Sequence, residues 1–281
     1  MRVDLSSKVA VITGGGGVLC TYFAKALSAS GAKVAILDLN KEAAQRVADQ
    51  IIKSGGEAIG VQCDVLNVES VRRAEHAVYD AYGQYHILIN GAGCAPASGC
   101  TTQETLNMSD VNNPDAVGNT FFNLVPDNIR VVTDINYMGT FITCQIFAKR
   151  MAGVEGATII NISSMSALSP LTKQPAYSAS KAAVTNFTQW LSTYLAEVGI
   201  RVNALAPGFF LTNINRHLLI NEDGNYNARS AKIVAGTPMK RFGNPEELVG
   251  TILYLCDSSA SSFITGVVIP VDGGFSSYCG V

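Results

Sequence analysis

Short β-rich apolar runs alternate with longer amphipathic stretches along this chain, and this alternation limits the possible folds more than any other feature. The predicted strands lie at 8–13, 33–37, 58–62, 86–90, 158–162, 201–205 and 267–271. The predicted helices lie near 18–30, 41–54, 67–82, 128–151, 176–198 and 245–256. Because helices of this length serve as crossovers between parallel strands, the pattern predicts an α/β fold. We expect a doubly wound sheet of about seven parallel strands flanked by helices.

Two stretches interrupt the alternation, although no linker divides the 281 residues and we expect one domain over 1–281. Residues 94–127 are rich in Thr, Asn, Ser and Asp and resemble an insertion. Residues 209–237 follow a predicted strand end and form a candidate substrate loop. Ligands of such sheets bind beyond the carboxyl ends of strands, so both stretches are candidate walls of a site. Surface decoration is the alternative.

The composition favours a small-molecule partner. With 48% hydrophobic and 15% charged residues the chain can build a large core, and its net charge of -2 offers no basic field for nucleic acid or an anionic membrane. The seven cysteines show no metal or redox spacing, so we expect reduced thiols and no metal site. The N-terminus runs into a strand without an apolar leader, and no run reaches about 18 apolar residues, which predicts a cytoplasmic protein.

Four consecutive glycines separate the first predicted strand from its helix. Backbone N–H groups at such a helix start can bind a dinucleotide pyrophosphate, because glycine has no Cβ to block its approach. A flexible turn is the alternative, but the run opens the first strand–helix unit, where a phosphate site belongs. The residues predicted to hold the pyrophosphate are Gly14, Gly16, Gly17, Val18 and Leu19.

Asp38 ends the second predicted strand, 24 residues after Gly14, where an acidic group can bind the adenosine ribose hydroxyls. Its charge would repel a 2′-phosphate, and no arginine lies in the glycine run or beside Asp38, so NAD is favoured over NADP. Capping of the following helix is the alternative role. Further residues at strand ends can line the adenine and ribose side: Asp64, Val65, Asn90, Ala92 and Gly93.

Tyr177 and Lys181 have the i, i+4 spacing that places a phenol and an ammonium on one helix face. Such pairs are often solvated surface pairs, but Ser164 follows a predicted buried strand 13 residues earlier. Tyrosine has a pKa near 10, so acting as a base at neutral pH requires a shift of about three units, or roughly 4 kcal/mol. An exposed ion pair contributes roughly 0.2–1 kcal/mol, so the shift requires a buried lysine together with oxidised nicotinamide.

These motifs resemble those of the short-chain dehydrogenase/reductase family over nearly the whole chain. The resemblance rests on the glycine-rich turn, on Asn90 to Gly93, on Ser164, on Tyr177 with Lys181, and on Pro207 with Gly208. It implies a Rossmann-type fold, an NAD(P)-dependent oxidoreductase and a homotetramer.

The resemblance also implies roles for single residues. Tyr177 would be the general acid/base, Lys181 would bind the nicotinamide ribose and lower the pKa of Tyr177, and Ser164 would orient the substrate. Asn136 matches an asparagine that holds a water linked to the lysine, although a local hydrogen bond within a helix would explain it equally well. Residues matching the segment beside the nicotinamide are Pro207, Gly208, Phe210 and Thr212.

One departure affects the cofactor end. The family pattern would place glycines at 18 and 20, where this chain has Val18 and Cys20. Close approach of a pyrophosphate must therefore depend on Gly14 to Gly17, and the helix must pack differently at Cys20.

Within the family, the fuller pattern resembles a bacterial subgroup described as D-mannonate oxidoreductases, or fructuronate reductases. It implies hydride transfer between NAD(H) and a secondary alcohol of a sugar acid. A substrate carboxylate requires a cation or several donors. The candidate substrate residues are Ser164, Ser166, Lys173, Arg216 and His217, of which each charged one is otherwise a solvated surface group.

Three alternatives stay open at the level of sequence. Gluconate 5-dehydrogenase or another polyol or sugar-acid dehydrogenase would use the same residues. A 3-oxoacyl-carrier-protein reductase would require a basic patch, which the sequence does not clearly show. A non-catalytic nicotinamide-sensing protein would be expected to lack a catalytic residue, whereas Asn136, Ser164, Tyr177 and Lys181 are all present.

Overall fold

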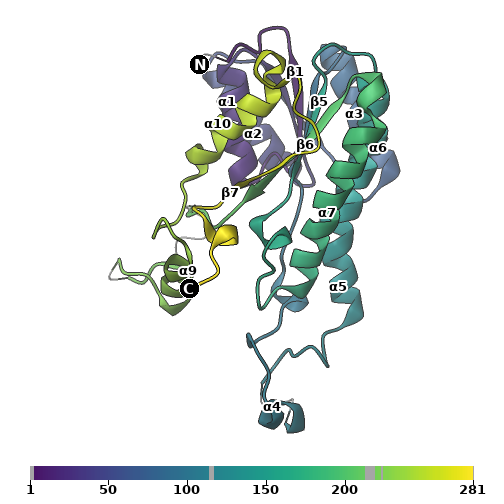
Figure 1. Ribbon diagram of the computed structural model, residues 1–281. Coiled ribbons are helices and arrows are strands. Elements are labelled where there is room, and N and C mark those ends of the chain that lie inside the picture. Colours follow the sequence, from purple (N-terminus) through teal and green to yellow (C-terminus); the bar gives the residue numbers. More distant parts are fainter. Residues whose placement is uncertain (1–2, 114–116, 213–218, 223, 281) are drawn as a thin grey trace.

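Seven strands form one parallel sheet in the computed structural model, which describes residues 3–113, 117–212, 219–222 and 224–280 (Figure 1). The sheet confirms the predicted fold class, and its strand order is β3-β2-β1-β4-β5-β6-β7. The strands are β1 (Val9–Thr13), β2 (Lys33–Asp38), β3 (Ala58–Gln62), β4 (Ile87–Asn90), β5 (Thr158–Ile162), β6 (Arg201–Pro207) and β7 (Val268–Val271).

The chain changes direction across the sheet between β1 and β4. It winds from β1 through β2 to β3 on one side, and then from β4 to β7 on the other. Ligands of open parallel sheets bind at such a reversal, beyond the carboxyl ends of the strands. The glycine run leaves β1 at this point, and Asn90 to Gly93 leave β4 beside it, since Thr13 is in register with Asn90.

Helices cover both faces of the sheet (Figure 1). One face packs against α1 (Val18–Ala29), α2 (Lys41–Lys53) and α10 (Val249–Cys256). The other packs against α3 (Val68–Tyr82), α6 (Gly139–Met151) and α7 (Pro175–Tyr194). Neighbouring strand residues face opposite layers: Ala10 and Ile12 join the first core, whereas Val9 and Val11 join the second.

The predicted helix over 128–151 is divided into three parts. It begins earlier, as α5 (Pro126–Thr133), because proline fits the first turn of a helix. A π-helical turn, Asp134–Met138, then leads into α6. Asn136 lies in this turn and is fully buried, and such turns often occur at functional sites.

Two further helices differ from their predicted bounds, α7 at its end and α10 at its start. α7 stops at Tyr194, and Ala196–Val198 forms a short 3-10 turn before Gly199, whose φ of 78° ends the helical run. The segment before α10 opens as a 3-10 turn, Pro245–Leu248, rather than as an α-helix.

Both stretches predicted as site walls contain helices that were not predicted. Residues 94–127, called the arm below, contain the 3-10 turn Ala97–Gly99 and α4 (Met108–Asn112). Figure 1 shows that α4 lies far from the sheet, at the end of this arm. The substrate loop contains α9 (Ala228–Gly236). A third short helix, α11 (Ser258–Ser261), follows α10.

A buried polar network fixes the carboxyl ends of β4 and β5 to the helices behind them. Asn90 donates to Asn161 at 2.8 Å, and Asn161 donates to Thr188 on α7 at 2.9 Å. Thr143 on α6 in turn donates to Asn90 at 2.6 Å. Each of these side chains is almost fully buried, so the satisfied network holds the strand ends in one arrangement.

Within the described ranges, no helix has the length and apolar character needed to cross a membrane.

Candidate active site

The glycine run lies in close contact with two neighbouring segments. A Cβ on Gly14 would lie 2.7 Å from the Ala92 Cα, and Gly14 has a φ of 62°, which side chains rarely adopt. A Cβ on Gly16 would lie 2.7 Å from the Ala43 Cβ on α2. The run therefore packs closely against α2 and the loop after β4, and side chains at Gly14 and Gly16 would prevent this packing.

The first turn of α1 offers unpaired donors at the end of this run. Gly17 caps the helix without a side-chain hydrogen bond, and the first turn contains no acidic residue. The first N–H groups of a helix have no partner within it, so those of Val18 and Leu19 are free to bind an anion. This geometry fits a dinucleotide pyrophosphate.

Asp38 lies beside the glycine run and uses both carboxylate oxygens. Its Oδ2 accepts from the Gly16 N–H and its Oδ1 from the Asn40 N–H, each at 3.0 Å. The cap of α2 is Asn40, whose side chain accepts from the Ala43 N–H, so the alternative role of Asp38 as a helix cap is excluded. Each oxygen keeps a second lone pair that can accept a ribose hydroxyl.

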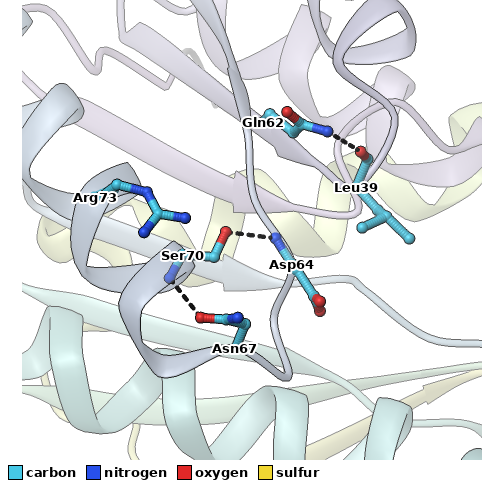
Figure 2. Close-up of a pocket in the computed structure, with 6 residues that line it drawn as sticks. All are labelled: Leu39, Gln62, Asp64, Asn67, Ser70 and Arg73. Carbon is cyan, nitrogen blue, oxygen red and sulfur yellow. Dashed lines mark hydrogen bonds between the residues drawn. The ribbon is translucent and has the colours of Figure 1, made fainter.

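A cavity of about 440 Å³ lies beyond the carboxyl ends of β2 and β3 (Figure 2). Asp64 lines it, with its Oδ1 accepting from the Leu66 N–H and its own N–H donating to Ser70. Val65 packs against Gly139, where a Cβ would lie 2.7 Å away. Arg73 lines the same cavity and was missed, because only the fold brings α3 beside the residue after Asp38. The cavity is lined by Leu39, Gln62, Asp64, Asn67, Ser70 and Arg73.

The loop after β4 runs from the glycine run to Asn136 and Lys181. The Asn90 side chain points into the buried network, so only its backbone faces this loop. Gly93 lies against two predicted catalytic residues: a Cβ there would lie 2.6 Å from Asn136 Oδ1 and 3.3 Å from Lys181 Nζ.

Asn136 holds the next residue of this loop from both sides. Its Nδ2 donates to the Cys94 carbonyl at 2.8 Å, and its Oδ1 accepts from the Cys94 N–H at 3.1 Å. The same Nδ2 also donates to the Val132 carbonyl at 2.9 Å, which is the local bond expected for a helix-interior residue. The side chain therefore joins the π-helical turn to the loop that lies against Lys181.

Tyr177, Lys181 and Ser164 meet where β5 ends beside α7. The Lys181 Nζ donates to the Ile162 carbonyl at 2.8 Å and lies 5.7 Å from the centre of the Tyr177 ring. Ser164 begins a short 3-10 turn and accepts from both the N–H and the hydroxyl of Ser166, at 3.2 and 3.0 Å. Ser164, Ser166 and Lys181 are all buried, and Tyr177 is partly buried.

Burial dominates the ionisation of this group. Burial lowers the pKa of Lys181 to about 8. The amine therefore carries its positive charge at neutral pH and loses it as the pH rises above about 8. Burial raises the pKa of the Tyr177 phenol, which the hydrogen bond with Ser164 opposes. The protein's own groups therefore keep Tyr177 protonated, and its use as a base requires additional positive charge beside it.

The loop after β6 passes close to the turn after β7. Pro207 ends β6, and a Cβ on Gly208 would lie 2.6 Å from the Asp272 Cα. Phe210 follows as a nearly buried ring, and Thr212 is partly exposed. The loop thus begins at the carboxyl edge of the sheet, next to β5.

The predicted substrate residues are not all in one place. Ser166 is buried against Ser164, whereas Lys173 is exposed in the loop before α7. Arg216 and His217 lie outside the described residues. Among the described residues, no group of three or more His, Cys, Asp or Glu side chains could hold a metal ion.

The departure at Cys20 has a structural counterpart at Gly91. The Cys20 thiol lies in the space beside this glycine, where a Cβ on Gly91 would lie only 2.2 Å from the sulfur. The thiol is buried, which raises its pKa to about 12. A side chain on α1 has thus taken the room that a side chain in the loop after β4 would otherwise need.

Comparison with known proteins agrees with this arrangement. A family model described as enoyl-(acyl carrier protein) reductase matches residues 19–276. An uncharacterized oxidoreductase of Bacillus subtilis is 48% identical over 281 residues, which cover 100% of this chain and 99% of the relative. The chain belongs to the short-chain dehydrogenase/reductase family. As a member of this family, it is an oxidoreductase.

Members of this family with different names align with the chain. A structure from Haemophilus influenzae, described as a candidate D-mannonate oxidoreductase with bound NAD, has a TM-score of 0.94 and 48% identity, covering 99% of this chain and 98% of the other. A 3-oxoacyl-[acyl-carrier-protein] reductase of Synechocystis is 32% identical over 271 residues, covering 96% of this chain and 97% of the relative. The family therefore settles the reaction class but leaves the substrate to be argued separately.

The contact between Cys20 and Gly91 gives a direct test of the glycine exchange. We expect Gly91→Ala to lower the free energy of unfolding by about 1–3 kcal/mol, because the new methyl group overlaps the sulfur. Cys20→Ala removes the sulfur, so adding it to Gly91→Ala should recover part of the loss, with a coupling of about 1 kcal/mol. Urea unfolding of the four proteins measures this. Strictly additive effects would contradict the account.

Proposed function

We propose that this protein is an NAD(H)-dependent oxidoreductase that interconverts D-mannonate and D-fructuronate, the secondary alcohol and ketone forms of a sugar acid. The observation that carries the proposal is the position of the buried Lys181. It lies beside Tyr177 and Ser164, at the end of β5 and next to the loop after β4. The non-catalytic alternative has no support from these residues, since each of the expected catalytic residue types is present.

Tyr177, Ser164 and Lys181 have different roles in this reaction. When bound, oxidised nicotinamide supplies the acceptor for the hydride of the carbinol carbon. The Tyr177 phenolate takes the hydroxyl proton during oxidation and returns it during reduction. Ser164, buried and fixed by Ser166, holds the reacting oxygen, and the Lys181 ammonium stabilises the phenolate.

Asn136 supports this group through the loop after β4 rather than by touching the substrate. It holds the backbone of Cys94, and with it Gly93, against Lys181. A shift of this loop would change the space around the ammonium and therefore its effect on Tyr177.

The preference for NAD(H) over NADP(H) depends on Asp38. Its carboxylate lies at the glycine run, where it would bind ribose hydroxyls and repel a 2′-phosphate. The Haemophilus influenzae structure with bound NAD, at 48% identity, supports the same preference. Arg73 lies in the neighbouring cavity and opposes this repulsion, so the preference should be strong but not absolute.

Asp38→Asn removes the charge of Asp38 and keeps one of its two backbone hydrogen bonds. The amide oxygen can still accept the Gly16 N–H, which holds the glycine run, whereas the bond from the Asn40 N–H is lost. The repulsion of a 2′-phosphate should disappear. We expect the Kd of NADPH to fall at least about 10-fold relative to that of NADH, which corresponds to about 1.4 kcal/mol. Fluorescence titration of both cofactors measures this, and an unchanged ratio would refute the role of Asp38.

The sugar-acid substrate is supported by the relative described as a candidate D-mannonate oxidoreductase. Purified protein should oxidise NADH with D-fructuronate and reduce NAD with D-mannonate, both followed at 340 nm. Tyr177→Phe should bind NADH normally but lose about 10²–10⁴-fold in kcat, because only the acid/base hydroxyl is removed. Absence of turnover across a panel of ketohexonates would refute the substrate, and full activity of Tyr177→Phe would refute the mechanism.

We also propose a homotetramer. Two exposed aromatic residues on α7 support assembly. Trp190 stacks on Tyr194 with ring centres 4.9 Å apart, and these residues are 53% and 70% exposed, respectively. Contiguous exposed apolar groups of this kind mark protein–protein interaction sites. Light scattering should give four times the protomer mass. A monomeric mass would contradict the proposal, and Trp190→Glu with Tyr194→Glu should dissociate the assembly.

A further inference from the structure

The arm and the substrate loop are joined by an ion pair. Glu104 from the arm and Lys232 from α9 form a salt bridge, and Lys232 also donates a hydrogen bond to the Glu104 carboxylate. These residues are 128 positions apart, so the pair fixes two segments that the sequence does not connect. Both segments extend beyond the carboxyl edge of the sheet (Figure 1). Ser164 follows the end of β5 at this edge, and Tyr177 lies beside it in the first turn of α7.

Arg229 lies on the same side of α9 as Lys232. It is three positions earlier, and residues three apart are neighbours on one helix face. Because Lys232 contacts the arm, Arg229 faces the arm as well. Its charge agrees with this placement: burial raises the pKa of the Cys100 thiol in the arm, and Arg229 opposes the rise.

Lys173 reaches the same place from the loop before α7. The Thr101 N–H of the arm donates to the Lys173 carbonyl at 3.0 Å. Gly99, two positions earlier, is buried, and a Cβ there would lie 3.8 Å from the Ala176 Cβ. The base of the arm therefore holds Lys173 beside the first turn of α7, four positions before Tyr177.

The charges in this place do not balance. Lys173, Arg229 and Lys232 provide three positive charges, and Glu104 provides one negative charge that Lys232 already neutralises. Across the described ranges, neither Lys173 nor Arg229 forms an ion pair or a side-chain hydrogen bond. The hydrogen bond from Lys232 is the main cause that lowers the pKa of Glu104, and Lys173 adds to it, so both lysines act at this carboxylate. Two cations are thus left without partners in a protein of net charge -2.

We propose that Lys173 and Arg229 bind the carboxylate of the substrate, and that the Glu104–Lys232 pair holds the two cations on facing segments. The inference rests on the proposed function and deepens it. An arginine can bind a carboxylate through two parallel hydrogen bonds, and a lysine adds a point charge. An extended sugar acid would place its carboxylate here with its reacting carbon at Tyr177.

The test compares an anionic and a neutral ligand of otherwise similar shape. D-mannonate and D-mannitol are titrated against the protein–NADH complex, followed by NADH fluorescence, so binding is measured without turnover. We expect Lys173→Gln and Arg229→Gln each to raise the Kd of D-mannonate about 10-fold, and to leave that of D-mannitol nearly unchanged. Arg229→Lys should retain more affinity than Arg229→Gln. The matched control is Lys53→Gln, an exposed lysine in the last turn of α2.

Each result separates this inference from the proposed reaction. Charge-dependent binding of D-mannonate without turnover would support the anion site and refute the reaction. Equal binding of D-mannonate by the wild type and the Gln variants would overturn the anion site, even if turnover is observed. Tighter binding of mannitol 1-phosphate than of D-mannonate would also overturn it, because the site would then recognise a phosphate.

Discussion

The hydrogen bond from the Lys181 ammonium to the Ile162 carbonyl is the interaction on which the site depends. It fixes a buried charge at the end of β5, and burial makes that charge costly enough to lower the pKa of Lys181 to about 8. Tyr177 is one helical turn away on α7, and Gly93 must lack a side chain because the ammonium and Asn136 occupy the adjoining space. The end of β5, the helix α7 and the loop after β4 therefore meet at the Lys181 Nζ.

The glycine run shows how the family's cofactor loop can change without losing its geometry. Where the family pattern has glycine at 20, this chain has a buried thiol, and the room it needs comes from Gly91 in the loop after β4. The close contacts of Gly14 with Ala92 and of Gly16 with Ala43 keep the loop narrow, while the N–H groups that begin α1 remain free for an anion. The departure thus concerns packing between two loops and leaves the anion-binding end of α1 intact.

Much of this could be predicted from the sequence, because strands and crossovers depend on local apolar patterns. All seven strands lie within two residues of their predicted bounds, and Tyr177 and Lys181 share a helix face as their spacing required. The π-helical turn at Asn136 could not be predicted, since apolar periodicity does not reveal a single extra residue within a helix. Arg73 and Arg229 were missed for a related reason, because only the fold brings α3 and α9 beside distant segments. The place of the Asn90 side chain could not be predicted either, because its partners Asn161 and Thr143 come from distant segments.

The central claim is that Tyr177 becomes a base only when the charges of Lys181 and oxidised nicotinamide act on it together. Tyrosinate absorbance at 295 nm, taken as the difference between the wild type and Tyr177→Phe, reports the pKa of this one phenol. Without NAD, burial should hold it above the ordinary value of about 10. With saturating NAD it should fall toward neutral pH, and Lys181→Met should abolish that fall. The same pKa with and without NAD would contradict the account.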